Sequence, residues 1–378
     1  MKKLFKGVLA LVMVASLAAC SSGDTTSEET TSTNDELVVG FVGPLEGNTS
    51  VYGIAVSNGG QLAIDDFNEA NGTNFVLQKE DSKGDSTEAV NAYNKLVDDD
   101  GIVGLLGGVL SGESTAIGSS SQSVGTPIIS ASATAAGFTL TGSNVFRGCF
   151  IDPLQATAVA NFSIDELSAT TAAIIYDAGS DYSTGMAEVF TEVFEAAGGT
   201  VVEYEAYNSG DVDFNTQLTK ISQANVDVVF SPNYYNDDYL IMKQAKDLGV
   251  TATFLGGDGW DGVLAIEGMD ATVVEGAVFV NHYAPDDADV AEWLARYKDV
   301  FGVDPNAFSV LGYDSMNILL EAIYAAEDPT DSAAVVANMQ ATDYNGVLGH
   351  LVFDENGDPI KDLAYITVKD GSYVTYGK

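Results

Sequence analysis

Short apolar runs alternate with longer amphipathic segments along most of the chain, starting at Leu37. The runs have the length of β-strands, and the segments have the apolar spacing of helices that bury one face. The predicted strands are Leu37–Val42, Phe75–Glu80, Ile102–Leu106, Pro127–Ser130, Ala172–Tyr176, Thr200–Tyr204, Val226–Phe230, Ala252–Leu255 and Ala277–Val280. The predicted helices between them include Ile54–Ala70, Thr87–Asp98, Ser183–Ala197, Phe214–Gln223 and Tyr239–Leu248. Strands and helices in turn predict parallel sheets linked by right-handed crossovers.

The alternation falls into two separate runs, one ending near Arg147 and the other extending from Ala172 to Val280. Later predicted helices are Ala288–Phe301, Asn306–Ala326 and Ala333–Gln340, and a β-rich terminal piece follows them. Late helices need a sheet to pack on, so the chain is expected to pass between two units more than once. The pattern therefore predicts an α/β fold with two Rossmann-like lobes, parallel central sheets and a multi-strand hinge.

Each lobe is expected to combine segments that are far apart in the sequence. We assign residues 37–152 and 283–360 to lobe 1, and residues 153–282 and 361–378 to lobe 2. Ligands of open α/β sheets bind beyond the carboxyl ends of the strands. Two lobes that face each other would therefore form one cleft from two such edges.

The first residues have the features of an export signal. A basic start, with Lys2, Lys3 and Lys6, precedes the apolar stretch Val8–Leu17, which is too short to span a bilayer comfortably. The stretch ends in Leu17-Ala18-Ala19-Cys20, which resembles the bacterial lipobox. That resemblance implies a signal peptide over residues 1–19 and a diacylated Cys20 as the new N-terminus. The alternative is an ordinary signal peptide that leaves a free Cys20.

Residues 20–36 consist almost entirely of Ser, Thr, Gly, Asp, Glu and Asn. Such a segment cannot bury enough apolar surface to offset the entropy lost on ordering. We expect a flexible tether between a lipid and the globular body. The protein is therefore expected to be extracytoplasmic and anchored by lipid to the bacterial cell membrane.

The formal net charge is −40, and loss of the predicted signal peptide with its three lysines makes it −43. This charge argues against nucleic acid and anionic lipid as binding partners. Phosphate or dicarboxylate ligands usually recruit arginine, and only twelve Lys and Arg residues remain in the mature chain. Cys149 is alone once Cys20 is used by the anchor, so no intrachain disulfide is expected. A monomer is expected.

Motifs for catalysis are sparse. The two histidines, His282 and His350, have no Cys, Asp or Glu at metal-ligand spacing. The chain contains neither a G-x-S-x-G elbow nor a P-loop. Asp354–Asp358 partly matches an EF-hand loop, but Pro359 replaces the required glycine, so we interpret the segment as a polar turn. We expect no catalytic residue, cofactor or metal, and an enzyme is the least favoured class.

Polar loops follow the predicted strands of the first run. Ser111 is placed to cap the helix after the third predicted strand, with Glu113 in its first turn. The free N–H groups of such a turn form an anion site without a cation; taken alone, however, Ser111 is only a cap. The next loop offers hydroxyl groups two residues apart, on Ser132 and Thr134.

The later loops carry aromatic residues and one isolated acid. Tyr182 and Tyr234 follow strands of the second run, and Asp258 lies among glycines beside Trp260. A buried carboxylate needs a positive partner, and no Lys or Arg is near Asp258 in the sequence. A ligand ammonium group would meet that need. Donors on one lobe and an acid on the other suit a small zwitterion.

The sequence resembles the branched-chain (Leu/Ile/Val) amino-acid-binding proteins of the type I periplasmic-binding fold, which feed ABC transporters. The resemblance extends from about Leu37 to near the C-terminus. Its landmarks are Val42-Gly43-Pro44-Leu45, Tyr52-Gly53, Gly107–Thr115, Ser130–Thr134, Asp181–Gly185, Tyr234 and Gly257-Asp258-Gly259. It implies a solute-binding lipoprotein that delivers an amino acid to a permease and ATPase complex.

The resemblance also implies ligand-binding roles for residues of both lobes, namely Tyr52, Ser111, Ser132, Thr134, Tyr182, Tyr234 and Asp258. Ser111, Thr134 and the backbone around Ser132 would bind the ligand carboxylate, and Asp258 would bind the ammonium group. Tyr182 and Tyr234 would close over the ligand, and Tyr52 would border its side-chain pocket.

Two departures leave the ligand side chain open. Asp258 stands where the best-known leucine binders carry the longer Glu, and the loop at Gly112-Glu113 differs from their serine run. Trp260 is expected to fill part of the pocket and to favour a smaller or different side chain. The alternatives are another amine, an amide or a quaternary ammonium ligand, which aromatic rings near an acid would suit, and a ligand sensor that serves a signalling receptor.

Overall fold

The computed structural model describes residues 36–377 of the chain. The predicted signal peptide, Cys20 and nearly all of the predicted tether lie outside these residues. Within the described part of the chain, no helix is both long and apolar enough to cross a membrane.

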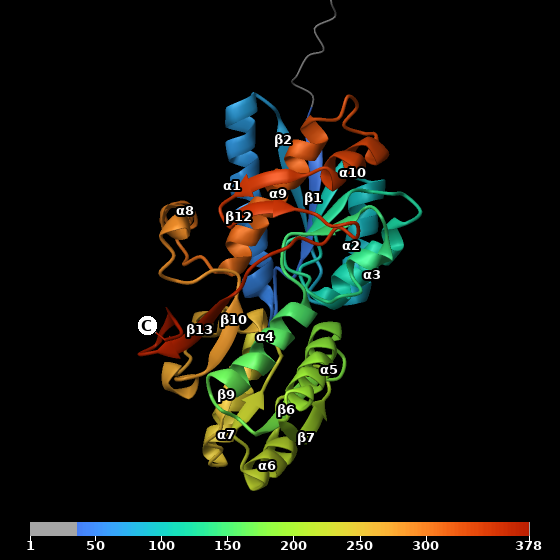
Figure 1. Cartoon of the computed structure of the whole chain (residues 1–378). Coiled ribbons are helices and arrows are strands. Elements are labelled where there is room, and N and C mark those ends of the chain that lie inside the picture. The colour runs from blue at the N-terminus through green and yellow to red at the C-terminus, as the bar shows by residue number, and fades with distance from the viewer. Residues whose placement is uncertain (1–35, 378) are drawn as a thin grey trace, which may run out of the picture. The chain divides into compact units, whose positions relative to one another are not determined.

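A five-stranded parallel sheet forms the centre of the first lobe, in the strand order β2-β1-β3-β4-β5. Its strands are β1 (Leu37–Gly43), β2 (Phe75–Asp81), β3 (Gly104–Gly107), β4 (Ile128–Ser130) and β5 (Val145–Arg147). The helices that flank it are α1 (Ser50–Asn71), α2 (Ser86–Asp98), α3 (Ser111–Ser121) and α9 (Ala307–Tyr324) (Figure 1).

Alternate residues of these strands face opposite layers of helices. Val39 and Phe41 pack in a core shared with α1 and α9, whereas Val42 and Leu105 pack with residues of α2 and α3. Because helices cover both faces, every position of β3, β4 and β5 is buried, whereas the edge strand β2 is only partly buried. The inner strands accordingly appear in the sequence as short apolar runs.

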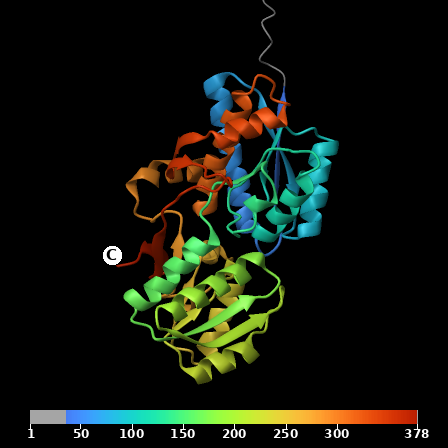
Figure 2. The same ribbon diagram turned by 45° about the vertical axis from the view of Figure 1, so that its right-hand side comes forward.

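A seven-stranded sheet forms the centre of the second lobe, in the order β14-β13-β10-β9-β8-β6-β7. Its strands are β6 (Thr171–Asp177), β7 (Thr200–Tyr207), β8 (Val228–Phe230), β9 (Thr253–Gly256), β10 (Val278–Asn281), β13 (Ala364–Lys369) and β14 (Ser372–Thr375). Helices α4 (Asp152–Asp165) and α5 (Asp181–Ala196) pack on the face that contains Ala172 and Ile174. Figures 1 and 2 both show this green helix pair against the strands.

Helices α6 (Asn215–Ala224) and α7 (Tyr235–Asp247) cover the opposite face of the sheet, where they pack with Ala173 and Ile175 of β6. Strands β6, β7, β8, β9 and β10 run parallel, and β13 and β14 extend the sheet in antiparallel fashion. The nine strands predicted from the apolar runs are all present, with ends shifted by a few residues.

The chain passes between the two sheets repeatedly. It enters the second sheet after β5, and after β10 it forms α8 (Ala288–Phe301) and α9, of which α9 contacts β3 and β4. After α10 (Ser332–Gln340) and the hairpin of β11 (Asp343–Gly346) and β12 (Gly349–Val352), it joins the second sheet again at β13. Two α/β lobes with parallel sheets are thereby confirmed, while the single-residue lobe boundaries stay a prediction.

Two glycines allow α1 and α9 to pack unusually close together. A Cβ atom on Gly59 would lie 2.0 Å from the carbonyl oxygen of Ser309, and one on Gly312 would lie 2.5 Å from that of Val56. Real Cβ atoms do not approach carbonyl oxygens so closely. Any larger residue at either position would therefore push the two helices apart.

Some elements differ from the prediction. Helix α4 is absent from the predicted set, and the hairpin of β11 and β12 precedes the predicted hairpin turn at residues 354–358. The predicted turn is itself closed by an antiparallel bridge between Phe353 and Pro359. That segment is still a polar turn, because Asp354 accepts hydrogen bonds from the backbone N–H groups of Asn356 and Asp358. The Asp358 carboxylate also pairs with the buried Arg147 at 2.6 Å.

Candidate functional site

One cavity collects every residue that the sequence predicts to bind ligand. Its lining residues are Tyr52, Val109, Leu110, Ser111, Ser132, Thr134, Tyr182, Tyr234, Asp258, Gly259 and Phe308. The enclosed space between them is small, about 10 Å³. The lining groups would therefore have to move apart to admit a ligand. Among the described residues, its lining includes one acid and no Lys or Arg.

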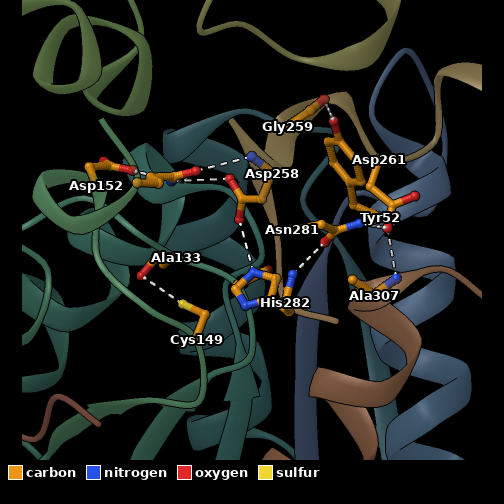
Figure 3. A network of polar contacts seen from close by, with 12 residues as sticks. Tyr52, Ala133, Cys149, Asp152, Asp258, Gly259, Asp261, Asn281, His282 and Ala307 are labelled. Atoms are coloured by element: carbon orange, nitrogen blue, oxygen red, sulfur yellow. Dashed lines mark hydrogen bonds and ion pairs between the residues drawn. The ribbon is translucent and has the colours of Figure 1, made fainter. Parts of the chain in front are cut away.

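Asp258 lies directly after β9 and is only 3% exposed. Figure 3 shows its carboxylate between two side chains that are distant in the sequence. Gln155 donates to Asp258 Oδ1 at 3.2 Å and accepts from the Asp258 backbone N–H at 3.0 Å. His282 Nε2 lies 3.2 Å from Asp258 Oδ2. Because a carboxylate can accept on about four lone-pair sites, capacity remains for a ligand.

His282 directly follows β10, at the same edge of the sheet as Asp258, because β9 and β10 are parallel neighbours. Its ring stacks on Phe150, with centroids 3.8 Å apart and an interplanar angle of 17°. Its backbone N–H donates to Asn281 Oδ1 at 2.8 Å. Burial lowers the pKa of His282 below its ordinary 6.5, while the hydrogen bond to Asp258 acts in the opposite direction.

A second acid, Asp152, lies behind Asp258. Gln155 Nε2 bridges the two carboxyl groups, because it also donates to Asp152 Oδ1 at 2.9 Å. Burial raises the pKa of Asp152 to about 8, and the negative charge of Asp258 adds to the rise, whereas hydrogen bonds from Thr134 and Gln155 oppose it. Asp152 is thus predominantly protonated at neutral pH, and Asp258 carries the negative charge of the pair.

The opposite end of the cavity is formed by the start of α3. Leu110, not Ser111, is the N-cap, so the predicted capping role of Ser111 is wrong by one residue, and Ser111 is the first helical residue. Glu113 accepts hydrogen bonds from the backbone N–H groups of Val109 and Leu110 at 3.0 and 2.9 Å. The next amides belong to the first turn, which has no intrahelical acceptors for them.

The hydroxyl groups of this end are held by the neighbouring loop. Ser111 Oγ accepts from the backbone N–H of Ala135 at 3.2 Å, which leaves its own proton free to be donated. Ser132 Oγ donates to the carbonyl oxygen of Val109 at 2.8 Å, so that side chain joins two loops. Burial raises the pKa of Glu113 to about 7, so the acid behind this turn is partly neutral near pH 7.

Three tyrosine rings enclose the cavity, namely Tyr182 and Tyr234 from the second lobe and Tyr52 from the first. Tyr182 and Tyr234 stack with centroids 5.3 Å apart and an interplanar angle of 8°, and Tyr52 meets Tyr234 edge-on at 5.8 Å. The Tyr182 hydroxyl accepts from the backbone N–H of Gly259 at 3.2 Å. The rings therefore present flat aromatic surfaces next to Asp258.

Tyr52 connects the two lobes. Its hydroxyl, at the start of α1, donates to the carbonyl oxygen of Gly259 and accepts from the backbone N–H of Tyr235 at 3.2 Å. Asn236 donates nearby to the carbonyl oxygen of Asn48. Because the Tyr52 hydroxyl is already bonded to protein, only its ring is available to border the cavity.

Asp261 makes a second connection between the lobes. It follows β9 and accepts from the backbone N–H of Ala307, the first residue of α9, at 2.8 Å. Asn281 also donates to it, at 3.0 Å. An anion at a helix N-terminus is favourable, although burial raises the pKa of Asp261. This acid is occupied by structure and is not part of the cavity lining.

Trp260 contradicts the prediction that it fills the ligand pocket. The side chain is fully buried, and its indole N–H donates to the carbonyl oxygen of Ser231 at 2.8 Å. The ring stacks with Phe279 inside the second lobe. It turns away from the cavity because Ser231 and the core offer a hydrogen bond and apolar contact together. Trp260 therefore sets no limit on the ligand side chain.

Residues 257–262 have the spacing G-x-G-x-x-G, which can indicate a dinucleotide site. They follow β9 but lead into a short 3₁₀ turn (Asp258–Trp260) and not into the helix that such a site requires. A Cβ atom on Gly257 would lie 2.5 Å from the Tyr182 hydroxyl, and one on Gly259 would lie 2.4 Å from the Asn233 carbonyl oxygen. These glycines serve close packing around the cavity.

Sequence reasoning missed His282, Gln155, Asp152 and Phe308. Gln155 and Asp152 lie on α4, whose existence the apolar pattern does not predict. His282, in contrast, directly follows a predicted strand. Because ligands bind beyond the carboxyl ends of strands, the loop that contains His282 could have been selected from the sequence in the same way as the other loops. Phe308 lines the cavity from α9 and stacks near Tyr52, with centroids 4.4 Å apart.

Two larger and more open depressions lie elsewhere on the described surface. One, of about 640 Å³, lies between α8 and the loop joining β11 to β12, and the other, of about 920 Å³, lies between α8 and the loop after Asp261. Neither contains a residue that the sequence predicts to bind ligand. Within residues 36–377, no group of His, Cys, Asp and Glu could hold a metal ion.

The chain matches the family described as periplasmic binding protein over residues 36–372. It is 31% identical over 334 residues to the Leu/Ile/Val-binding protein BraC3 of Rhizobium johnstonii, an alignment that covers 85% of this chain and 89% of that protein.

Solved structures show the same similarity. The leucine binding protein LivK of Thermotoga maritima is 32% identical, with a TM-score of 0.83, over 90% of this chain and 98% of that one. The branched-chain amino acid transporter substrate binding protein LivJ of Streptococcus pneumoniae, solved in complex with isoleucine, is 28% identical, with a TM-score of 0.84 and the same two coverages.

Proposed function

The chain belongs to the periplasmic binding protein family, and from this premise we propose that it captures an aliphatic, branched-chain amino acid between its lobes and delivers it to an ABC permease. The observation that carries the proposal is the composition of the cavity. One acid lies at one end, hydroxyl and amide donors lie at the other, and no Lys or Arg is among the described lining residues. A zwitterion complements both ends.

At the amine end, Asp258 would accept hydrogen bonds from the ammonium group. Charge-assisted hydrogen bonds of this kind are short and roughly twice as strong as neutral ones. Tyr182 and Tyr234 would cover the group and exclude water. An anionic ligand without an amine would instead face the Asp258 carboxylate and be repelled.

At the carboxylate end, Ser111 would donate from its hydroxyl group, and the first-turn amides of α3 would donate from the backbone. Thr134 would also donate, if its hydroxyl accepts the proton of the neutral Asp152 and no longer donates to that side chain. Ser132 would contribute through its backbone, because its hydroxyl is bonded to Val109. The proposed carboxylate site therefore needs no cation. This agrees with a chain that has only 15 Lys and Arg residues in total.

The ligand side chain would lie against apolar groups. Val109, Leu110 and Phe308 line the cavity together with the ring of Tyr52. Burying an aliphatic side chain of this size contributes about 1.5–3 kcal/mol. Since Trp260 is not in the lining, it does not itself restrict the ligand to a side chain smaller than that of leucine or isoleucine.

A quaternary ammonium compound is the second candidate ligand. The observation that favours it is the group of three tyrosine rings beside Asp258, an arrangement that also binds cations through their faces. Such a ligand would not use the donors at the start of α3 unless it carried a carboxylate, as betaine does.

Calorimetric titration separates these candidates. The panel contains L-leucine, L-isoleucine and L-valine, leucinamide, which lacks the carboxylate, 4-methylpentanoate, which lacks the amine, and betaine and choline. We expect binding of the amino acids and none of leucinamide or 4-methylpentanoate. Tight binding of betaine or choline without heat from any aliphatic amino acid would overturn the assignment.

The remaining features of the proposal concern location and partners. We propose that Cys20 carries the lipid anchor and that the partners are a permease and ATPase complex. We also propose that the protein is monomeric and returns its ligand unchanged. Expression of the full chain and of Cys20→Ser tests the anchor, because only the serine variant, which has no thiol to carry the lipid, should leave the membrane fraction. Chemical change of the bound amino acid, followed by NMR, would contradict the non-catalytic role.

A further inference from the structure

His282 lies against the carboxylate that is proposed to hold the ligand amine. We propose that His282 positions Asp258 for the ligand ammonium group, and that protonation of His282 weakens ligand binding by neutralising the charge of Asp258. This inference rests on the proposed function, since it requires a positively charged group at Asp258. It adds a positioning residue and a pH dependence to that site.

Three contacts fix the imidazole ring. The ring stacks on Phe150 with centroids 3.8 Å apart, and its Nε2 lies 3.2 Å from Asp258 Oδ2. The backbone N–H of His282 donates to Asn281 Oδ1 and so holds the residue that carries the ring. The side chain of His282 is 1% exposed and that of Asp258 is 4% exposed. With so little freedom, His282 and Gln155 hold the carboxylate from both sides and fix the direction of its remaining lone pairs.

The hydrogen bond also fixes the tautomer. A carboxylate only accepts, so the proton between the two groups belongs to Nε2. A neutral ring then has an unprotonated Nδ1, and this atom is buried without a partner in the described structure. A second proton on the ring would leave a buried N–H donor unsatisfied, which is costly. The closed site therefore favours the neutral ring and leaves one net negative charge at Asp258.

Several titratable groups face this pair from the surrounding elements, namely Asp152 on α4, Asp261 after β9, Tyr182 on α5, Cys149 beside Phe150, and Lys361 before β13. Lys361 disfavours a second proton on His282. Asp152, whose pKa is about 8, is mostly protonated below pH 7. Glu113, at the other end of the cavity, has a pKa of about 7 and also titrates on mild acidification. The contribution of His282 is therefore the part of the pH dependence that His282→Gln removes.

The direction of the effect follows from proton linkage. A bound ammonium group repels a second proton on His282, so the ligand-bound protein holds that proton less tightly than the free protein. Ligand release is then coupled to proton uptake, and affinity falls as the pH decreases through the free-state pKa of His282. Because burial lowers the free-state pKa of His282 below its ordinary 6.5, the fall in affinity lies at the acidic end of the pH profile. Below that pKa the dissociation constant rises by up to about tenfold per pH unit.

The first test compares pH profiles of wild type, His282→Gln and His282→Asn. The probe is whichever of L-leucine, L-isoleucine and L-valine binds most tightly at pH 8. The Gln amide replaces Nε2 and still donates to Asp258 but does not titrate. The shorter Asn amide replaces Nδ1 and does not reach Asp258. We expect the dissociation constant of His282→Gln at pH 8 to lie within about threefold of that of wild type, and its affinity not to fall as the pH is lowered. We expect His282→Asn to bind weakly at pH 8 and at acidic pH alike.

The second test does not depend on a variant at position 282. The chain contains only two histidines, and His350 is an exposed residue paired with Asp343 on the hairpin of β11 and β12. In His350→Gln, the ring signal in NMR comes from His282 alone. We expect saturating ligand to lower the pKa of that signal by about one unit or more.

The outcomes separate the inference from the function on which it rests. Parallel pH profiles for wild type and His282→Gln, or a ring pKa unaffected by ligand, contradict the role of His282 and leave amino-acid capture intact. Absence of binding by all three amino acids at pH 8 contradicts the proposed function and the inference with it.

Discussion

The carboxylate of Asp258 is held by two neutral donors and still has acceptor capacity toward the cavity. Gln155 and His282 satisfy one lone pair on each oxygen, and no Lys or Arg is among the described lining residues. A buried charge in this position gains most when a ligand cation joins it. Affinity at the scale of single residues should therefore depend on this acid more than on any other side chain.

Asp258→Asn is expected to reduce amino-acid affinity by about 2–5 kcal/mol, because the ligand ammonium group would lose its only charged partner. Isothermal titration measures the change, and circular dichroism checks that the fold is retained. Asp314→Asn is the matched control, because Asp314 is also buried but accepts from the amides of Val347 and Leu348 away from the cavity. Affinity unchanged in Asp258→Asn would refute the ammonium role.

Ser111→Ala and Thr134→Val are expected to weaken binding by about 1–3 kcal/mol each, the cost of an unmet hydrogen bond to a charged group. Ser111→Ala should also lower the melting temperature, because the Ala135 N–H loses its acceptor. Titration and thermal unfolding separate the two effects. If both variants bind the ligand as tightly as wild type does, the ligand carboxylate must lie elsewhere.

Asp152 makes stability depend on pH. Its pKa rises from 3.8 to about 8 on folding, so the folded state binds this proton more tightly than the unfolded state. The resulting stability is complete below about pH 4 and is lost progressively as the pH rises to about 8. Asp152→Asn cannot titrate at this position. The melting temperature of the variant relative to that of wild type should therefore increase from pH 5 to pH 8. Asp165→Asn, exposed at the other end of α4, is the control and should show a constant difference.

At the scale of elements, α1 meets the loop after β9 through Tyr52. The hydroxyl of Tyr52 bonds Gly259 and Tyr235, which belong to the other lobe, while its ring borders the cavity. The same contact thus joins the lobes and helps to enclose the ligand. Closing and binding should therefore be coupled through this one side chain.

Tyr52→Phe keeps the ring and removes the hydroxyl. We expect ligand affinity to fall by about 1–2 kcal/mol, since two hydrogen bonds between the lobes are lost, with little change in unfolding free energy. Titration together with a distance measurement between labels on the two lobes tests this. Tyr93→Phe is a matched control, because its hydroxyl bonds Thr126 within lobe 1. A similar loss of affinity in both variants would contradict the coupling.

Helix α4 explains why part of the site could not be predicted. Its buried residues recur at helical spacing, but they include Asp152, Gln155 and Ser163. A search for apolar periodicity overlooks a helix whose buried face includes several polar residues. Asp152 and Gln155 are among them because they lie behind Asp258, so their place at the site also weakens the apolar pattern of α4. The predicted strands and the long helices were recognised because most of their buried positions are apolar.

At the scale of the whole molecule, the two lobes and the cavity between their strand ends were predictable from topology. Parallel strands place their carboxyl ends together, so loops distant in sequence converge without any local signal of contact. Which side chains meet across the loops was not predictable in the same way. His282 approaches Asp258 only because β10 lies beside β9. The spacing of apolar residues predicts where strands occur but not their order in the sheet.

The formal net charge of −40 should make stability respond to salt. Like charges on a compact chain repel, and dissolved ions screen that repulsion. We expect the melting temperature to rise by about 2–4 °C between 50 mM and 1 M NaCl, which corresponds to about 1 kcal/mol. The same measurement in KCl controls for specific sodium binding. A fall in either salt would show that surface ion pairs outweigh the repulsion.

The glycine pair of Gly59 and Gly312 bears on how this protein could acquire new ligands. Helix α1 carries Tyr52 and α9 carries Phe308, so the spacing of the two helices sets the width of the cavity wall. A mutational scan scored by uptake should find both glycines intolerant, although neither lines the cavity. Directed evolution of ligand preference would therefore succeed by diversifying the strand-end loops and leaving this helix crossing untouched.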